Sequence, residues 1–475
     1  MSHANYSLTV RVAIPAQIGM FGRVMQAIGD AGGEVGGVDI VRSTKTSVIR
    51  DITVYARDDA HGEEILANLR ELVGVEVLSA SDRVMLSHIG GKMTMQNRMP
   101  LETRDDLSMA YTPGVARVCM AINHDPERVW DLTIRANSVV VVSDGSSVVG
   151  EGDLGPLAAL PAVESKCMFL REMAGIDGFP LPVTVRDPDE ITNSIAKICS
   201  VFAGVHLTDI AAPRCFEVQR KLGAAVDIPV FHDNQEGTSA ALLGALLNGL
   251  EVGGKRLEDA TVVVAGLGPS GVATVRILVA AGVGEVLACN REGSVHAGRT
   301  DLGPELAWIA ERTNPDRREG DARTMIAGAD AFIGLSAPGI LSADDIRTMA
   351  PDPIVFALAL PEPEISLEEA GGVAAVYGTG RPDAPNQINS ALAFPGIWRG
   401  ALDCRATRIN DAMVMAAARA IAATSAGALA PDHVVPSVFN AQLVPNVAAA
   451  VREAAEASGV ARVEDAAPSR AAAAG

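Results

Sequence analysis

Aromatic residues are scarce in this sequence, and basic residues are outnumbered by acidic ones. Phe, Trp and Tyr make up 4% of the 475 residues, and 39 Lys and Arg stand against 58 Asp and Glu, which gives a formal net charge of −19. Base-stacking surfaces need aromatic side chains, and a negative field repels phosphate backbones. We therefore expect no nucleic-acid partner, although a local cation in a cleft can still hold an acidic metabolite.

The sequence also lacks closely paired cysteines and long apolar runs. No Cys-x-x-Cys spacing occurs among the six cysteines, which are Cys119, Cys167, Cys199, Cys215, Cys289 and Cys404. This argues against a zinc site or a disulfide framework and favours reduced thiols. The N-terminus has no basic start followed by an apolar stretch, and Gly, Asp or Arg interrupts every apolar run before it reaches membrane-spanning length. We expect a soluble cytoplasmic protein without a membrane partner.

The apolar content is nevertheless sufficient for several cores. Hydrophobic residues form 48% of a chain that is longer than one typical domain. The pattern predicts an α/β protein with three domains, at residues 1–86, 87–236 and 237–445. The Ala-rich remainder, residues 446–475, is expected to form a terminal helix and then a frayed tail.

The first 86 residues alternate between strand-like and helical patterns in the order βαββαβ. This order is typical of a small ferredoxin-like sandwich. Because the loop at residues 14–19 leads directly into a helix, the unit resembles an ACT domain, a ligand-sensing module of metabolic enzymes. A small effector would then bind here. A dimerisation domain without a ligand is an equally open interpretation.

A glycine-rich turn follows a strongly apolar strand in the C-terminal part of the chain. The run Thr261–Ala265 leads into Gly266-x-Gly268-x-x-Gly271, and a helical segment follows directly. The first glycine permits a tight turn, the second lets a pyrophosphate approach the backbone, and the third allows close helix–strand packing. The helix N-terminus offers free N–H groups to the anion. The order predicts a Rossmann-type nucleotide site rather than a glycine-rich turn in an ordinary α/β unit.

The position that usually distinguishes NAD from NADP carries an amide. An acidic residue normally ends the second strand of this fold and bonds the ribose hydroxyls. Here the strand ends at Asn290, and Arg291 follows. An amide can still bond ribose and does not repel a 2′-phosphate, with which Arg291 can pair. Both NAD and NADP remain candidate cofactors, with a slight preference for NAD.

Several longer motifs resemble those of malic enzymes, in the order found in that family. They are AYTPGVARVC (110–119), VVSDGSSVVGEGDLGPLAALPAVESK (141–166), DIAAPRCFEV (209–218), PVFHDNQEGTSAA (229–241), FIGLSAPGIL (332–341), FALALPEPEI (356–365) and RPDAPNQINSALAFPGIWRGALD (381–403). Malic enzymes oxidatively decarboxylate malate to pyruvate with NAD(P). The resemblance implies a malic-enzyme N-terminal α/β domain before the Rossmann-type domain, a small hydroxy acid as substrate, and a homo-oligomer.

The resemblance also assigns catalytic roles. Tyr111 corresponds to the general acid that protonates the enol formed after carbon dioxide leaves. Lys166 corresponds to the base that takes the hydroxyl proton as hydride moves to the nicotinamide, and Asp233 to the aspartate that orients this lysine. We expect these groups to meet in the cleft between the second and third domains.

The metal site of the family is altered in this chain. The resemblance implies three carboxylate ligands, and Thr208, Asp209 and Asn234 occupy the three positions. Only Asp209 keeps a negative charge. Because Mg²⁺ and Mn²⁺ prefer anionic oxygen ligands, use of either ion is doubtful.

Other changes lie in the same motifs. Glu236 replaces a histidine, Leu360 replaces an asparagine that contacts the substrate carboxylate, and Glu151 replaces an apolar residue. Asn389 is kept as a substrate-binding residue, whereas Ser390 replaces a second asparagine.

Three interpretations follow from these changes. In the first, Asn234 and Glu236 supply oxygens, and malate is turned over with weaker metal affinity. In the second, the enzyme keeps its nicotinamide chemistry and accepts a related 2-hydroxy acid. In the third, catalysis is lost and the protein is a ligand-sensing homologue. We favour an oxidoreductase with impaired or altered metal use, because Tyr111, Lys166 and Asp233 are retained together.

Overall fold

The chain divides into two compact units, Met1–Thr94 and Met95–Gly475. The computed structural model describes residues 6–462. Within this range no helix is both long and apolar enough to cross a membrane.

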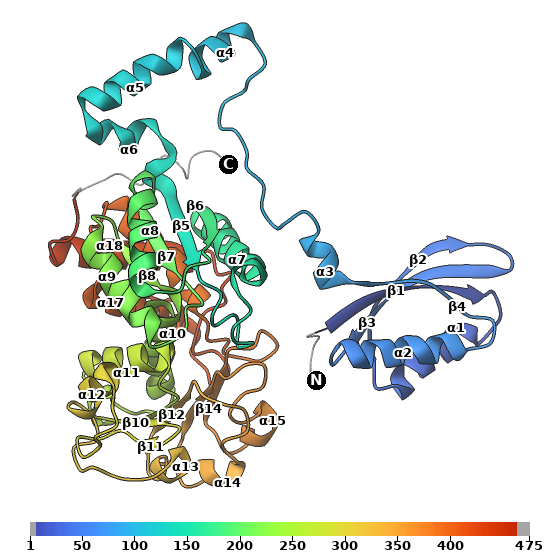
Figure 1. Ribbon diagram of the computed structural model, residues 1–475. Coiled ribbons are helices and arrows are strands. Elements are labelled where there is room, and N and C mark those ends of the chain that lie inside the picture. Colours follow the sequence, from blue (N-terminus) through green and yellow to red (C-terminus); the bar gives the residue numbers. More distant parts are fainter. Residues whose placement is uncertain (1–5, 463–475) are drawn as a thin grey trace. The chain divides into compact units, whose positions relative to one another are not determined.

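Six elements build the N-terminal unit in the predicted βαββαβ order (Figure 1). They are β1 (Tyr6–Pro15), α1 (Met20–Asp30), β2 (Glu34–Ser43), β3 (Ser47–Ala56), α2 (Asp59–Glu71) and β4 (Glu76–Asp82). The antiparallel sheet has the order β2-β3-β1-β4, as in a ferredoxin-like sandwich. Alternate residues of β1, such as Leu8 and Val10, share a core with Val24 and Ile28 of α1. A short helix, α3 (Arg83–His88), follows β4.

A helical arm opens the second unit. Its elements are α4 (Arg104–Ala110), α5 (Gly114–His124), η1 (Pro126–Arg128), α6 (Val129–Leu132) and η2 (Ile134–Asn137). A capping box between Thr103 and Asp106 begins α4. No residue of α4 or α5 is buried, and these helices extend away from the sheets of their own unit (Figure 1). The arm therefore has no core of its own.

A four-stranded parallel sheet forms the next domain. Its order is β6-β5-β7-β8, and its strands are β5 (Ser138–Ser143), β6 (Asp177–Pro182), β7 (Gly204–Leu207) and β8 (Val230–His232). The helices between them are α7 (Pro156–Ala174), α8 (Pro188–Ile198), η3 (Cys199–Val201) and α9 (Arg214–Ala225). Every residue of β5 is buried, as expected for a central parallel strand.

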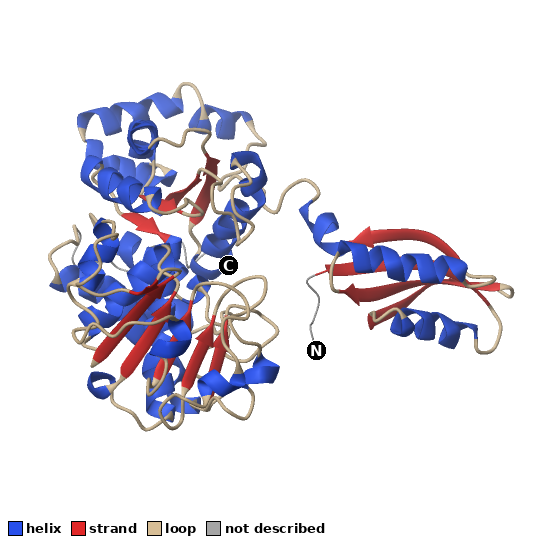
Figure 2. Cartoon of the chain, turned by 60° about the horizontal axis from the view of Figure 1, so that its bottom comes forward, coloured by secondary structure: helices blue, strands red, loops and turns tan. Residues whose placement is uncertain are grey.

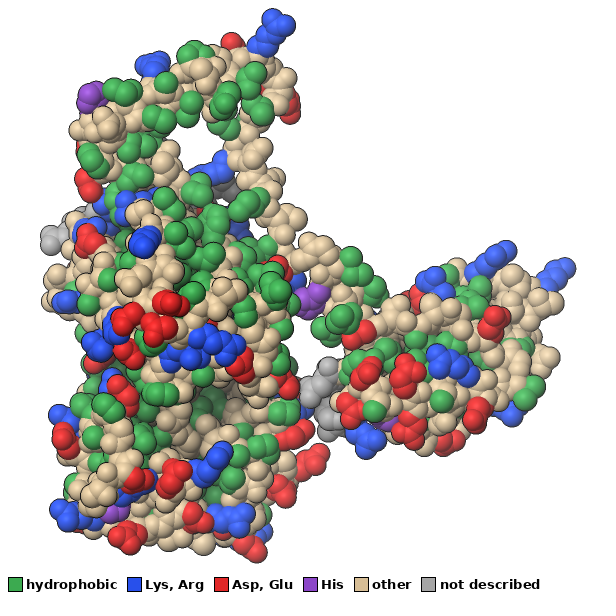
Figure 3. Space-filling view, viewed as in Figure 1, with side chains coloured by type: hydrophobic (Ala, Val, Ile, Leu, Met, Phe, Trp, Pro, Cys, Tyr) green, Lys and Arg blue, Asp and Glu red, His purple; other side chains and the backbone are tan. Residues whose placement is uncertain are grey.

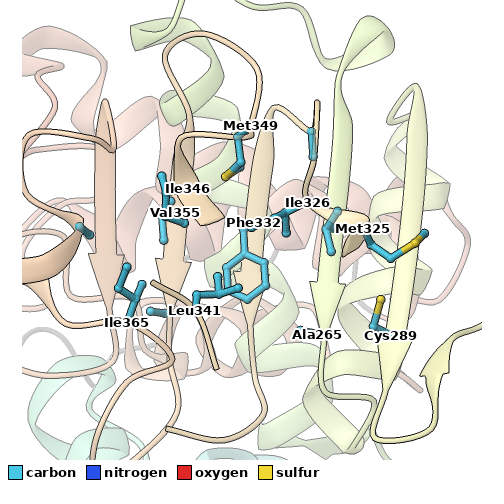
Figure 4. Close-up of a cluster of buried hydrophobic side chains, with 14 of the residues drawn as sticks. Ala265, Cys289, Met325, Ile326, Phe332, Leu341, Ile346, Met349, Val355 and Ile365 are labelled. Carbon is cyan, nitrogen blue, oxygen red and sulfur yellow. The ribbon is translucent and has the colours of Figure 1, made fainter. Parts of the chain in front are cut away.

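The predicted nucleotide-binding domain contains a six-stranded sheet of the order β11-β10-β9-β12-β13-β14. The strands are β9 (Thr261–Ala265), β10 (Glu285–Asn290), β11 (Gly293–Ser294), β12 (Ala331–Gly334), β13 (Ile354–Ala357) and β14 (Val376–Thr379). All neighbours are parallel except the short β11 (Figure 2). Figure 4 shows Phe332, Val355 and Leu341 within one apolar cluster of this domain.

Helices pack around this sheet and join the two domains of the second unit. Those within the nucleotide-binding domain are α10 (Thr238–Val252), η5 (Leu257–Asp259), α11 (Pro269–Ala281), α12 (Pro304–Ala310), α13 (Ala322–Met325), α14 (Ala343–Ile346) and α15 (Leu367–Ala370). Those that follow are η6 (Ser390–Leu392), α16 (Phe394–Asp403), α17 (Asp411–Ser425), η7 (Ala426–Ala428) and α18 (Leu443–Ala457). Because α16 contacts both α7 and α18, the C-terminal helices connect the domains. The predicted terminal helix begins at Leu443, and the predicted frayed tail from residue 463 lies outside the described residues.

Candidate active site

Three side chains from distant segments, Lys166, Asp233 and Ser390, form one cluster. Lys166 lies on α7, Asp233 begins the π-helical turn η4 (Asp233–Gly237), and Ser390 begins η6. Lys166 Nζ donates to Asp233 Oδ2 at 2.6 Å and to Ser390 Oγ at 3.4 Å, and Ser390 Oγ donates to the same carboxylate oxygen at 3.0 Å. The structure therefore joins the predicted base, its predicted partner and one predicted substrate residue.

The carboxylate of this cluster is held as an anion. Burial opposes ionisation of Asp233, but the charge of Lys166 and the hydrogen bonds from Lys166 and Ser390 outweigh burial, so the pKa of Asp233 lies below its usual range. The Lys166 side chain remains 22% exposed, whereas that of Asp233 is 3% exposed. A ligand can thus contact the Lys166 ammonium, while the buried Asp233 carboxylate holds that ammonium in place by its hydrogen bond.

An aromatic group that sequence reasoning did not select lies behind Asp233. Nε2 of the fully buried His206 is 3.7 Å from Asp233 Oδ1, and the Trp398 indole donates to His206 Nδ1 at 3.0 Å. Burial lowers the pKa of His206 to about 3, so this imidazole is neutral. His206 lies outside the family motifs, and Trp398 lies in the 381–403 motif without an assigned role, so only their three-dimensional contact reveals them.

Tyr111 does not join this cluster within one chain. It ends α4 on the helical arm and is 66% exposed. Its neighbours on the arm include exposed apolar side chains, which the space-filling view shows on the surface of α4 and α5 (Figure 3); they include Leu107, Met109 and Met120. The predicted acid is therefore presented to the outside of its own chain.

The three positions that correspond to metal ligands do not form a metal site. The Asp209 backbone N–H donates to Asn234 Oδ1 at 3.3 Å, and Thr208 is buried beside them. Burial raises the pKa of Asp209 to about 6, so the one carboxylate at these positions holds its proton more tightly than an exposed aspartate does. Among residues 6–462 no group of three or more His, Cys, Asp and Glu side chains is arranged to hold a metal ion. The residues present do not fit Mg²⁺ or Mn²⁺.

Glu236 is occupied by hydrogen bonds within the protein. Its Oε2 accepts from the His232 backbone N–H at 2.8 Å, and its Oε1 accepts from Gln219 Nε2. Burial raises the pKa of Glu236 to about 7. Because both oxygens have donors, this carboxyl supports the π-helical turn and is not directed to a ligand.

The remaining predicted substrate residues lie near the same domain boundary. Leu360 is 45% exposed, and its backbone carbonyl lies 3.3 Å from the position that a Cβ would take on Gly150. Exposed Glu151 follows in the same turn. Asn389 uses its Oδ1 to cap η6, accepting from the Ala391 N–H at 3.0 Å. An apolar side chain, Leu360, and an acidic one, Glu151, are thus exposed at these two positions.

The predicted glycine turn has the geometry that a pyrophosphate needs. Gly266 has a φ of 94°, and a Cβ there would lie 2.3 Å from the Leu335 carbonyl oxygen. A Cβ on Gly271 would lie 1.8 Å from the Gly266 carbonyl oxygen, whereas nothing lies within 4 Å of such an atom on Gly268. Open space therefore remains at Gly268, where α11 begins, and the residues fit a dinucleotide.

The comparisons with known proteins identify the family. Residues 90–187 match the model of the malic enzyme N-terminal domain, and residues 235–456 match that of the malic enzyme NAD binding domain. Over 463 residues the chain is 48% identical to the NAD-dependent malic enzyme of Geobacillus stearothermophilus, spanning 97% of this chain and 97% of that protein. The chain belongs to the malic enzyme family. This confirms the resemblance inferred from the sequence motifs.

Malic enzymes of both coenzyme types are among the relatives. The chain is 39% identical to the NADP-dependent malic enzyme of Halomonas elongata over 396 residues, which are 79% of this chain and 92% of that protein. The crystal structure of a NAD-dependent malic enzyme from Thermotoga maritima matches with a TM-score of 0.75 and 39% identity, covering 78% of this chain and 99% of that chain. The mixed α/β fold with a malic-enzyme N-terminal domain and a Rossmann-type domain is therefore shown. The ACT assignment and the domain boundaries stay predictions.

Proposed function

We propose that this chain is an NAD(P)-dependent oxidoreductase that oxidatively decarboxylates malate or a closely related 2-hydroxy acid. The observation that carries the proposal is the Lys166–Asp233–Ser390 cluster, which lies in the same unit as a glycine turn suited to a dinucleotide. Family membership supports the same reaction.

The residues of the cluster divide the proton chemistry of this reaction. Bound NAD(P)⁺ supplies the hydride acceptor. Lys166 Nζ, once unprotonated, takes the proton of the substrate C2 hydroxyl as hydride leaves C2, and Asp233 keeps the amine oriented. Loss of the carboxylate attached to C3 as carbon dioxide leaves an enolate, and Lys166 returns its proton to the C2 oxygen to give the enol. The Tyr111 hydroxyl then donates its proton to C3 while Lys166 takes back the enol O–H proton, which yields the keto acid.

The proposed reaction includes no step that depends on a divalent cation. Thr208 and Asn234 are neutral, so these three positions carry two fewer negative charges than three carboxylates would. A divalent cation bound to three carboxylates would cancel two negative charges. Asp209 alone, without an ion, therefore gives the same formal charge as three carboxylates with a divalent cation bound. Lewis-acid stabilisation is worth several kcal/mol, so turnover without it is expected to be slow.

The loss of the metal carboxylates also favours a second candidate function. A non-catalytic homologue would keep nucleotide binding and sense a ligand. The intact hydrogen bonds among Lys166, Asp233 and Ser390 weigh against it, because a sensor has no need for a positioned base.

The test is reduction of NAD⁺ and of NADP⁺ with L-malate, and then with other 2-hydroxy acids, with Mn²⁺ and with EDTA. Turnover that persists in EDTA is the expected result. Turnover of malate that EDTA abolishes would make the chain an ordinary malic enzyme. Coenzyme binding without turnover of any acid would favour the sensor.

The exposed arm supports the prediction of a homo-oligomer. α4 and α5 bury none of their residues, and Tyr111, which lies between them, is 66% exposed. A second copy of the chain can cover the apolar side chains of the arm. Tyr111 of the first copy would then enter the cleft that holds Lys166 of the second copy. We assign a dimer in which arms are exchanged, because two-fold symmetry completes both sites at once.

The N-terminal unit keeps its two predicted roles. Ile18 is fully exposed in the β1–α1 connection, and Gly19 at the start of α1 has a φ of 90°, as in a loop that can enclose a small effector. Exposed Ile40 and Val41 on β2 suit dimerisation equally. A shift in melting temperature of the full chain with a small metabolite would support the effector role.

A cytoplasmic location remains part of the proposal. All six cysteines are free, and Cys119 alone among them is exposed. Free thiols without partners suit a reducing compartment.

A further inference from the structure

The end of β10 is where folds of this kind meet the adenosine ribose of a dinucleotide. β9 and β10 are parallel neighbours, and the Gly266 N–H donates to the Cys289 carbonyl at 2.9 Å. Asn290 is the next residue and therefore lies directly beside the glycine turn. Its side chain is well placed to contact the ribose and any group attached to it.

The amide of Asn290 is oriented by two donors. Its Oδ1 accepts from an Arg299 guanidinium nitrogen at 2.9 Å and from the Glu292 backbone N–H at 3.2 Å. A flipped amide would place its NH₂ group against both donors, so this orientation is fixed. The NH₂ group donates to no other residue that the structure describes, so it is available to a ligand. It can donate to a phosphate oxygen, but it cannot accept the ribose hydroxyl protons as a carboxylate does.

An open pocket of about 420 Å³ is lined by residues that follow Asn290 in the chain, and both basic and acidic side chains contribute to it. Arg291, His296 and Arg299 line it. Arg291 is exposed and makes no ion pair with any residue that the structure describes, whereas Arg299 is paired with Asp301. The Gly298 N–H donates to His296 Nδ1 at 3.1 Å, so in the neutral ring Nε2 carries the proton and is a donor. The cavity therefore offers donors and one uncompensated cation.

Acidic residues of the same cavity do not cancel this preference. Asp321 is held by Thr324, whose N–H and hydroxyl donate to its Oδ1 at 2.9 and 2.8 Å. Glu292 and Glu319 also line the cavity, and both are exposed side chains that are free to turn into solvent. A bound phosphate would favour rotamers that point these carboxylates away.

We infer that Asn290 and Arg291 bind the 2′-phosphate of NADP, while Arg299 holds the Asn290 amide in place, so that this enzyme prefers NADP⁺ to NAD⁺. The inference rests on the proposed nucleotide-dependent function and reverses the slight preference for NAD drawn from the sequence. A 2′-phosphate is an acceptor-only dianion, which matches an amide NH₂ group and guanidinium donors. An aspartate at position 290 would repel it.

The test separates the phosphate site from catalysis by using nucleotides that lack nicotinamide. Calorimetry of the full chain with adenosine 2′,5′-bisphosphate and with adenosine 5′-monophosphate should show about tenfold tighter binding of the bisphosphate. Arg291→Ala should remove most of this difference, and Asn290→Asp should remove it and favour NAD⁺ in turnover. Arg347→Ala, an exposed arginine of the same domain that is paired with Asp344, is the matched control and should leave the difference unchanged.

Each outcome decides one point. Equal affinity for the two nucleotides, or a higher kcat/KM with NAD⁺ than with NADP⁺, would overturn the inference while leaving the proposed function standing. Binding of neither nucleotide would overturn the nucleotide site and with it the proposed function. Because Arg291 is exposed and unpaired, its variant should fold even if Asn290→Asp does not.

Discussion

The indole N–H of Trp398 donates to Nδ1 of His206 at 3.0 Å in the core behind Asp233. Since Nδ1 accepts, Nε2 carries the proton, and it lies 3.7 Å from Asp233 Oδ1. Trp398 can approach because residue 204 is glycine: a Cβ there would lie 2.1 Å from the indole ring. The tryptophan therefore fixes the tautomer of a neutral imidazole whose protonated Nε2 lies near the carboxylate that holds Lys166, beyond hydrogen-bond distance.

The variant Trp398→Phe should distinguish the packing role of Trp398 from its role in orienting His206. Loss of the indole donor leaves His206 Nδ1 buried without a partner, at a cost of about 1–3 kcal/mol in the free energy of unfolding. The ring can then adopt the other tautomer and direct a lone pair at Asp233, so kcat should fall several-fold while KM for the coenzyme is unchanged. Denaturant unfolding and steady-state kinetics measure the two effects.

The matched control for this variant is Trp308→Phe. Trp308 stacks against Arg276 and Arg312 and has no part in the cluster. It should alter neither kcat nor coenzyme KM. If Trp398→Phe lowered stability alone and left kcat at the wild-type value, the tryptophan would be a packing residue only.

Lys166→Ala should lower kcat by about 10²–10⁴-fold, because the reaction loses its general base. Lys166→Arg should fail almost equally, since a guanidinium stays protonated. Coenzyme binding should be retained, because the glycine turn is untouched. Lys221→Ala on α9, which removes ion pairs to Asp189 and Glu217, is the control that should keep activity. Full activity of Lys166→Ala would exclude this lysine as the base.

The local sequence was enough to predict the secondary structure that neighbouring residues determine. The βαββαβ order and the strand, turn and helix over Thr261–Ala281 appear as expected, because period, glycine spacing and helix starts are set by neighbouring residues. Lys166 and Asp233 are 67 residues apart and were still paired correctly, because each lies in a motif of a family with many members.

Long-range contacts between residues to which no motif assigns a role were not predictable in this way. His206 and Trp398 are 192 residues apart, and neither side chain suggests the other. The direction of the Asn290 amide depends on Arg299, nine positions later. The helical arm shows a similar limit. Local capping residues such as Thr103 indicate where its helices begin, but no local pattern indicates which surface the arm packs against.

Restoring the carboxylates should restore metal binding. The wild-type chain is expected to bind Mn²⁺ weakly, because Asp209 alone supplies charge among the three corresponding positions. Thr208→Glu combined with Asn234→Asp should tighten Mn²⁺ binding by at least about tenfold, as measured by electron paramagnetic resonance of free Mn²⁺. The single variant Asn234→Asp should give a smaller gain. Tight Mn²⁺ binding by the wild-type chain would show that the altered residues still form the site.

Glu236 should make the folded state less stable as pH rises. Its pKa is near 4.5 when unfolded and about 7 in the fold because of burial, so the folded state binds the extra proton between these values. Stability from this group is therefore present at low pH and lost as pH rises toward 7, by at most on the order of 3 kcal/mol.

Glu236→Gln cannot ionise and keeps an acceptor for the His232 N–H. Relative to wild type, its unfolding midpoint in denaturant should therefore rise between about pH 5 and about pH 8. Exposed Glu217→Gln on α9 should show no such trend. Parallel pH curves for wild type and Glu236→Gln would mean that Glu236 is ionised in the fold throughout this range.

The exchange of arms can be tested with two inactive variants. Tyr111→Phe removes the acid on the arm, and Lys166→Ala removes the base in the cleft; each homodimer should be nearly inactive. In a mixed dimer the cleft of the Tyr111→Phe chain keeps its lysine and receives the intact Tyr111 of the other chain. The cleft of the Lys166→Ala chain lacks the lysine and receives the arm without the tyrosine, so it carries both defects. Random exchange in an equal mixture should therefore restore about one quarter of wild-type activity.

The alternative arrangement predicts a different result from the same mixture. If Tyr111 served the Lys166 of its own chain, every cleft in every mixed dimer would lack one group, and mixing would restore nothing. Lys166→Ala mixed with Asp233→Asn provides the control, because both defects lie in the cleft and no exchange of arms can combine them. Activity from the first mixture but not from the control therefore identifies an active site shared between two chains, which explains why Tyr111 is exposed in one chain alone.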